Sequence, residues 1–271
     1  RARVKRAALR PRYFKASFND ERKRDKLPLL VSAASAGRGR SFPATRAVPD
    51  QPVRMSLGNG LTFLFVNDPQ SPVCFFHAAV GAGDGRSTQH YSLGGITAHM
   101  LRMGTSHLRR EELDRIEGSF VRPIDIMVDS VCSRFQTTFL PEDFSRVLDW
   151  LAEIWTRPIF PDEYFGDVKE KLSRALVFQQ GHPETVINNV LCKLMCGARS
   201  RLASPPIKAL LKDLELITRE EVAMFYKQHY AANTTVIAMG GPFDPEKIMS
   251  RVDERLGQWQ QCAENKIIRQ E

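Results

Sequence analysis

The sequence predicts an α+β fold in which helices pack on one face of a mostly antiparallel sheet. A strand over residues 53–57 is followed by a return strand over 61–66, and the Asn59-Gly60 pair between them suits the positive φ of a hairpin turn. Residues 73–80 are apolar nearly throughout, which predicts a central, buried strand. A helix that starts at Pro141 has an apolar stripe at helical spacing, formed by Phe144, Val147, Leu148, Leu151 and Trp155.

A second stripe, over residues 94–103, predicts a buried helix that stops at Gly104. The stripe consists of Ile96, His99, Met100 and Met103. Residues 111–118 read as a short amphipathic helix closed by a glycine, and two further helices are expected over about 160–180 and 184–197.

The last third of the domain begins with a helix that Thr218 caps, because Glu221 stands at the capping-box position. This helix ends near Tyr230, a buried strand follows up to Gly241, and a last helix covers 244–256.

Composition excludes several classes of protein. The chain has 271 residues, of which 42% are hydrophobic and 26% charged, as in an ordinary globular protein. It has no apolar run of about 18 residues, the length that a membrane-spanning helix needs. The five cysteines are odd in number and irregularly spaced, which argues against a secreted disulfide framework. Cys192 and Cys196 could share a helix face, but we interpret them as buried small hydrophobes rather than a metal or redox pair.

The positive charge is concentrated at the start of the chain. Residues 1–50 hold 14 Lys and Arg against 4 Asp and Glu, a net charge of +10. Residues 51–271 hold 25 against 27, a net charge of −2. The basicity of the protein is therefore a property of its first fifty residues.

We interpret residues 1–52 as an extended basic arm and linker. Apolar residues are too sparse there to build a core, and the chain begins with Arg1 rather than Met, as a processed or partial sequence would. A phosphate backbone is the acceptor that best suits this charge, with the aromatic residue among the cations stacking on a base. The predicted RNA contacts are Arg1, Arg3, Lys5, Arg6, Arg10, Arg12, Tyr13, Lys15, Arg22, Lys23, Arg24 and Lys26. The alternatives are a leftover mitochondrial import signal or a tail that lies on an acidic protein surface.

Two features look functional but have simpler interpretations. Residues 81–85 are glycine-rich like a phosphate cradle, yet no helix follows directly and no Lys-Ser/Thr pair is present, which argues against a nucleotide loop. His77 falls on the apolar strand and is expected to be a core histidine.

Four blocks of sequence carry a family resemblance: Asn59-Gly60-Leu61, Gly104-Thr105, Phe160-Pro161, and residues 226–241. In their order and spacing they resemble the pitrilysin/insulinase-type peptidases, which include the mitochondrial processing peptidase. The resemblance covers residues 53–257 and implies one half-domain of the processing peptidase/LuxS-like metallohydrolase type. Complete members of that family have two such halves. The resemblance also implies a hairpin of two strands over 120–128 and 131–139, joined at Asp129-Ser130. Residues 258–271 are polar and are expected to leave the domain as a tail or linker.

The resemblance does not extend to the residues that bind zinc in the family. The family carries the inverted zinc motif H-x-x-E-H a few residues before the Gly-Thr pair. Here Gly95 stands at the first ligand position, Ala98 at the general base and His99 at the second ligand. The third ligand, a glutamate 76 residues further on in the family, corresponds to Ala175. Catalytic zinc needs three protein ligands and a water, so the motif predicts no metal, no other cofactor and no peptidase activity.

These observations favour a non-catalytic structural subunit of a large mitochondrial assembly. The basic arm points to the mitochondrial ribosome, on the matrix side, with rRNA and other protein subunits as partners. One alternative is a core-type scaffold subunit of the cytochrome bc1 complex. Another is the inactive partner subunit of a processing peptidase. A second peptidase-like half on another chain is a further expected partner.

Overall fold

The computed structural model describes residues 52–87, 89–180, 182–197 and 205–263. Within these ranges six strands form one sheet in the order β1-β2-β6-β3-β5-β4. Only β2 and β6 pair in parallel among them; the other four pairings are antiparallel, which confirms the expected sheet type. The strands are β1 Val53–Ser56, β2 Thr62–Asn67, β3 Cys74–Val80, β4 Asp125–Val128, β5 Ser133–Phe139 and β6 Thr235–Gly241.

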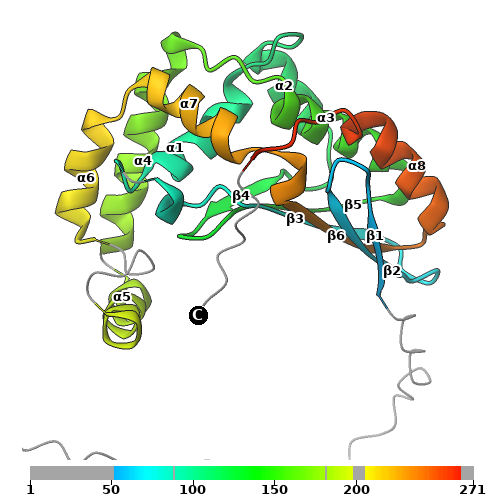
Figure 1. Cartoon of the computed structure of the whole chain (residues 1–271), viewed down its shortest axis with the longest axis horizontal. Helices are drawn as coiled ribbons and strands as arrows, with labels where there is room; N and C mark the ends of the chain where they lie inside the picture. The colour runs from blue at the N-terminus through cyan, green and yellow to red at the C-terminus, as the bar shows by residue number, and fades with distance from the viewer. Residues whose placement is uncertain (1–51, 88, 181, 198–204, 264–271) are drawn as a thin grey trace, which may run out of the picture. The chain divides into compact units, whose positions relative to one another are not determined.

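The helices gather mainly on one side of this sheet. Figure 1 shows α1, α2, α3, α7 and α8 together above the strands, whereas α5 lies apart, beneath α4 and α6. Their bounds are α1 Leu93–Met100, α2 Arg110–Glu117, α3 Phe144–Thr156, α4 Phe165–Gln180, α5 Pro183–Cys196, α6 Ile207–Leu216, α7 Arg219–His229 and α8 Pro245–Leu256. None of the described helices is long and apolar enough to cross a membrane.

The expectation that β3 is fully buried is wrong, because the helices cover only one face of the sheet. The strand is central, but it is not buried on both faces: Phe76 and Ala78 are buried, while Phe75 is 53% exposed. His77 lies on the same open face and is exposed, so it is not a core histidine. Side chains alternate along a strand, and the face opposite the helices meets solvent.

The structure differs from the sequence expectation in two elements. β4 begins at Asp125 rather than at Phe120, because Pro123 cannot donate to a sheet ladder. Helix α6 was not predicted, although Ile207, Leu210 and Leu214 follow a helical spacing behind Pro206. The other boundaries fall within a few residues of those expected, and the capping box at Thr218 and Glu221 is present.

The chain does not leave the domain at Gln258. Trp259 is only 4% exposed and stacks on Trp155, with ring centroids 5.6 Å apart. The backbone N–H of Cys262 donates to Oδ1 of Asn233 at 3.0 Å. For residues 258–263 the expected exit from the domain is therefore wrong, because Trp259 completes the core beneath α3.

Candidate functional site

Three of the four motif positions line one cavity of about 570 Å³. Gly95 and His99 reach it from α1 and Ala175 reaches it from α4, and the two helices pack against each other. β4, α5 and α6 supply further lining residues. Ala98 is fully buried and does not line the cavity. The structure therefore brings together the positions that the resemblance singles out, although they are 80 residues apart in the chain.

The imidazole of His99 stands in a setting that disfavours positive charge. Burial lowers its pKa to about 4, and the nearby cations Lys171 and Arg102 act in the same direction. Lys171 lies one helical turn before Ala175 on α4. The imidazole is consequently neutral at pH 7, and the same cations would repel a metal ion.

The donor set around His99 does not fit a catalytic zinc ion. Gly95 has no side chain and Ala175 offers only a methyl group. Within the described ranges, no group of three or more His, Cys, Asp or Glu side chains is placed to hold a metal. Zinc catalysis requires three protein ligands and an open position, so no step of a reaction can be derived through that ion.

Asp84 occupies the space beside Gly95. The N–H of Gly95 donates to Oδ1 of Asp84 at 2.8 Å. A Cβ added to Gly95 would lie 3.7 and 3.9 Å from the two carboxyl oxygens of Asp84. Burial raises the pKa of Asp84 to about 7, opposed by the bond from Gly95 and reinforced by the nearby carboxylates of Asp129 and Asp213. Asp84 was not predicted as a site residue, although its position inside the glycine-rich stretch is a signal that could have identified it.

The glycine-rich loop before α1 packs against the β4–β5 turn and does not cradle phosphate. The N–H groups of Gly83, Asp84 and Gly85 donate to the carbonyls of Val131, Asp129 and Ser130 at 3.3, 2.9 and 2.9 Å. A Cβ on Gly83 would come within 2.4 Å of the Val131 carbonyl carbon. The loop therefore needs glycine at position 83 for close packing, and its amides are committed to the turn.

A cluster around Asp213 fixes the segment that enters α1. From α6, the carboxylate of Asp213 accepts the N–H groups of Tyr91 and Ser92 at 2.7 and 3.2 Å. His90 Nδ1 lies 2.8 Å from the same carboxylate, and its Nε2 lies 3.4 Å from Glu221 of α7. Sequence reasoning missed this cluster because α6 itself was not predicted.

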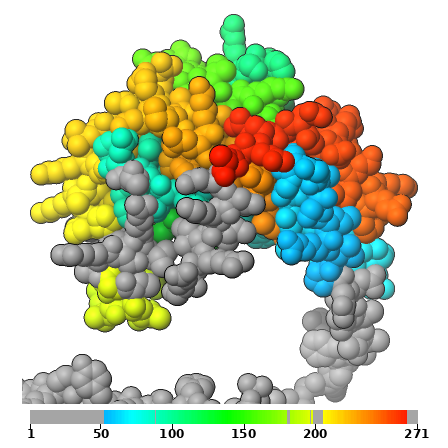
Figure 2. All heavy atoms as spheres, in the orientation of Figure 1, coloured from blue at the N-terminus to red at the C-terminus, as the bar shows by residue number. Residues whose placement is uncertain are grey.

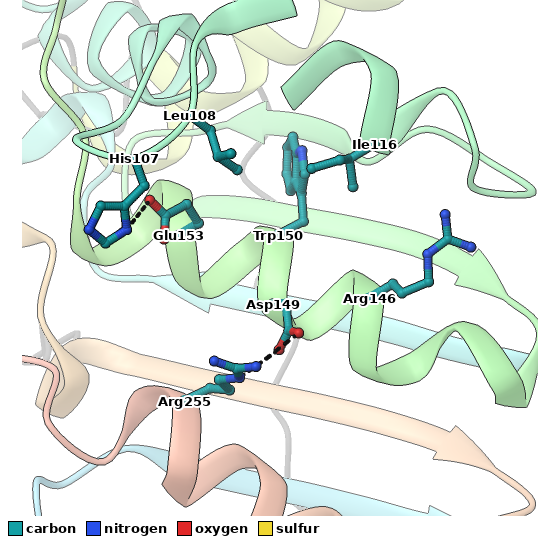
Figure 3. A pocket seen from close by; sticks show the side chains of 8 residues that line it. All are labelled: His107, Leu108, Ile116, Arg146, Asp149, Trp150, Glu153 and Arg255. Carbon is teal, nitrogen blue, oxygen red and sulfur yellow. Dashed lines mark hydrogen bonds and ion pairs between the residues drawn. The ribbon is translucent and has the colours of Figure 1, made fainter. Parts of the chain in front are cut away.

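A second cavity of about 430 Å³ opens between α3, α8 and the loop before α2 (Figure 3). The charged side chains that line it already have partners within the domain. Asp149 meets Arg255 at 2.7 Å, while Glu153 accepts the Thr105 hydroxyl at 2.8 Å and lies 3.3 Å from His107. Trp150 donates its indole N–H to the carbonyl of Leu113. Since each of these groups has a partner, the cavity offers little to recognise a ligand.

The predicted RNA contacts from Arg1 to Lys26 lie outside the described residues. Cys192 is partly rather than fully buried, and the side chain of Cys196 is not described.

The comparisons with known proteins agree with this fold. A family model described as "Peptidase M16 inactive domain" matches residues 216–270. Among curated proteins, the probable mitochondrial-processing peptidase subunit beta of Arabidopsis thaliana is 25% identical over 165 residues, which cover 57% of this chain and 29% of the relative.

Solved structures show the same likeness. A peptidase M16 inactive domain from Pseudomonas fluorescens superposes with a TM-score of 0.66 at 17% identity, over 76% of this chain and 50% of that one. Pitrilysin superposes with a TM-score of 0.68 at 14% identity, over 81% of this chain and 24% of that one. The chain thus spans half or less of the length of these relatives. The chain shares the fold of these structures over part of their length, and its sequence is similar to that of M16 peptidases over residues 216–270.

Proposed function

We propose that this chain is a non-catalytic, peptidase-derived structural subunit of a large mitochondrial assembly. The observation that carries the proposal is the cavity around His99, where the motif positions retain one imidazole and no second or third ligand. Without the metal no bound water is activated, and Ala98 cannot take up a proton in place of a glutamate. What remains is a folded half-domain suited to binding other subunits.

The mitochondrial location is supported by sequence similarity to a curated mitochondrial protein. The curated relative from Arabidopsis thaliana is named a subunit of a mitochondrial processing peptidase. The family model that matches residues 216–270 is itself described as an inactive domain. We propose the matrix side, in keeping with the RNA contact proposed for the basic arm.

Within mitochondria we propose the ribosome as the assembly. The first fifty residues carry a net charge of +10, whereas the rest of the chain carries −2. A basic arm on a nearly neutral domain suits rRNA contact. It suits an inactive processing-peptidase partner less well, since a net −2 domain with a +10 arm would attract basic presequences poorly. A cytochrome bc1 scaffold would account for the lost ligands but not for the arm.

We also propose that a second peptidase-like half on another chain completes the unit. The support is the share of each relative that this chain covers, which is 29% of the curated relative, 50% of the Pseudomonas fluorescens domain and 24% of pitrilysin. A half-domain of this kind would then form one side of a two-part scaffold.

The test compares the full chain with a variant that lacks residues 1–26. We expect the full chain to sediment with mitochondrial ribosomal particles and to bind RNA with an affinity that falls steeply with salt. The deletion should abolish RNA binding and leave the domain folded. Co-purification with haem-containing membrane complexes instead would favour the bc1 alternative. Chelator-sensitive cleavage of a presequence peptide would overturn the proposal as a whole.

A further inference from the structure

Helix α5 turns its apolar face to solvent. Leu194, Met195 and Ile187 keep 78%, 76% and 63% of their surface exposed. Val186, Val190 and Leu191 keep about half of theirs. The spacing 187, 190, 191 and 194 is that of a single stripe along one side of a helix. In an isolated domain such a stripe would normally face the core.

The other side of α5 faces the domain. Thr185 and Asn189 are less exposed than the stripe and line the cavity around His99. Cys192 lies on the same side and is also partly buried. The helix is thus amphipathic, but its small and polar side chains face the domain and its large apolar side chains face solvent. Folding alone does not explain this orientation, because it leaves the hydrophobic gain of the stripe unrealised.

The end of α4 enlarges the exposed area. Val177 and Phe178 are 54% and 71% exposed, and the ring of Phe178 lies 4.7 Å from that of His182 at the start of α5. We call these eight residues the α5 patch: Val177, Phe178, Val186, Ile187, Val190, Leu191, Leu194 and Met195. Figure 1 shows α5 at the margin of the domain, and in Figure 2 its atoms (yellow-green) form the lower left edge.

The patch is large enough for a stable interface. The eight residues keep 49–78% of their surface exposed, which amounts to roughly 750–1,000 Å² in total if a large apolar residue offers about 150–200 Å² when fully exposed. The largest apolar patch on a typical monomer is about 300–600 Å². A standard protein interface buries about 800 Å² on each partner. The α5 patch therefore supplies the apolar centre of one side of such an interface, which has about 20–30 residues in all.

We infer that the α5 patch is the surface on which a second copy of this chain docks, as a two-fold dimer. In a two-fold contact the same patch meets itself, which requires that it contain no cluster of like charges. The patch meets this requirement: α5 carries only Glu184 and Lys193 as charged residues, and both lie outside the stripe. A stripe at this spacing packs into its own copy when the helices run antiparallel.

The chemistry of α5 fits a membrane surface poorly. Helices that lie in a lipid interface carry several Lys and Arg on their polar face, and α5 has one lysine. The centre of the stripe lies between Val190 and Leu191, so an antiparallel copy places Ile187 of one chain opposite Leu194 of the other. The dimer does not depend on the ribosomal assignment, and its failure would leave that assignment standing.

The experiment measures the mass of the full chain by light scattering over a range of concentrations. We expect a dimer with a Kd in the micromolar range. Ile187→Glu and Leu194→Lys should each weaken it at least 30-fold, and an equimolar mixture of the two variants should recover a heterodimer. Met224→Glu, at a 59% exposed apolar residue of α7 outside the patch, should leave dimerisation unchanged.

Three outcomes would overturn the inference. The first is a chain that stays monomeric up to about 100 μM, with or without binding to anionic lipid vesicles. The second is a dimer that Leu194→Lys does not weaken. The third is a variant mixture that fails to re-form the dimer while circular dichroism shows both variants folded.

Discussion

The carboxyl group of Asp84 accepts a hydrogen bond from the backbone of Gly95 at 2.8 Å. An acidic side chain from the preceding loop therefore stands beside a helix position that has no side chain of its own. The cavity around His99 has a volume of about 570 Å³, with a neutral imidazole on one side and a carboxyl of raised pKa on another.

Two substitutions in this cavity should create a metal site. Gly95→His together with Ala175→Glu, with His99 retained, gives the three ligands that catalytic zinc requires. A Cβ at Gly95 has only ordinary contacts, the nearest at 3.7 Å. We expect the double variant to bind one zinc ion per chain at least 100-fold more tightly than the unaltered chain, measured against a competing chelator.

The matched control combines Ala175→Glu with Gly166→His. It adds one glutamate and one histidine, as the double variant does, but only the glutamate lies near His99. Gly166 stands in open space on α4. If this control bound zinc as tightly as the double variant, the motif positions would not form the site. Lys171, beside His99, sets a limit on the affinity, so adding Lys171→Gln should strengthen binding further.

Asp84 makes folding stability fall as the pH rises. Its pKa is raised from 3.8 to about 7 in the folded state. Between about pH 4 and 7 the folded chain therefore holds a proton that the unfolded chain has released, and stability declines across this window. Asp84→Asn keeps the acceptor for Gly95 and removes the titration. We expect the variant to be more stable than the unaltered chain by roughly 1–3 kcal/mol at pH 8, and about equal to it at pH 4.

Urea unfolding at several pH values measures this difference. Asp125→Asn, at an exposed aspartate of β4, is the matched control and should not reproduce the effect. A constant difference between Asp84→Asn and the unaltered chain from pH 4 to 8 would contradict the assignment of a raised pKa.

His99 should have the opposite effect to Asp84 and make folding stability rise as the pH rises. Its pKa is lowered from 6.5 to about 4 in the folded chain, so the unfolded chain takes up a proton first as the pH falls. The stability contributed by the neutral imidazole is complete above about pH 6.5 and is lost between there and pH 4. His99→Gln should remove this loss and leave the variant relatively more stable at pH 4 than at pH 7, by about 1–3 kcal/mol.

Proton NMR gives a direct check, since the His99 ring should titrate near pH 4. His77→Gln, on the exposed face of the sheet, serves both to assign the spectrum and as the control for unfolding. A His99 resonance that titrates near 6.5 would rule out the buried, cation-flanked environment.

Much of the fold could be predicted from local patterns. The turn at Asn59-Gly60, the stop at Gly104 with its φ of 146°, and the capping box at Thr218 are decided by residues close together in the chain. The positions Gly95, His99 and Ala175 could be placed in one site because the resemblance supplied their spacing, and the structure brings them to one cavity.

What escaped prediction depends on contacts between distant segments. Asp213 holds the segment before α1 from more than a hundred residues away. The polar composition from Gln258 onward predicted an exit from the domain, but the segment stays on it because Trp259 stacks on Trp155. The exposure of Phe75 and His77 depends on which face of the sheet the helices cover, and an apolar strand does not reveal that by itself.

The loop that carries Asp84 is packed so closely against the β4–β5 turn that position 83 should require glycine. A Cβ at Gly83 would come within 2.4 Å of the carbonyl carbon of Val131 and 2.5 Å of the carbonyl oxygen of Asp129. Both are backbone atoms of a tight turn, so the loop would have to move. We expect Gly83→Ala to lower the free energy of unfolding by about 1–3 kcal/mol, and to weaken the bond from Gly95 to Asp84.

Gly166→Ala is the matched control, because the same methyl group meets nothing within 4 Å on α4. Alanine is favoured over glycine in a helix by about 0.5–1 kcal/mol, so this variant should be as stable as the unaltered chain or slightly more so. Urea unfolding of the two variants separates loop packing from a general effect of losing glycine. Equal stability of the two would mean that Gly83 is not packed as closely against the β4–β5 turn as its contacts indicate.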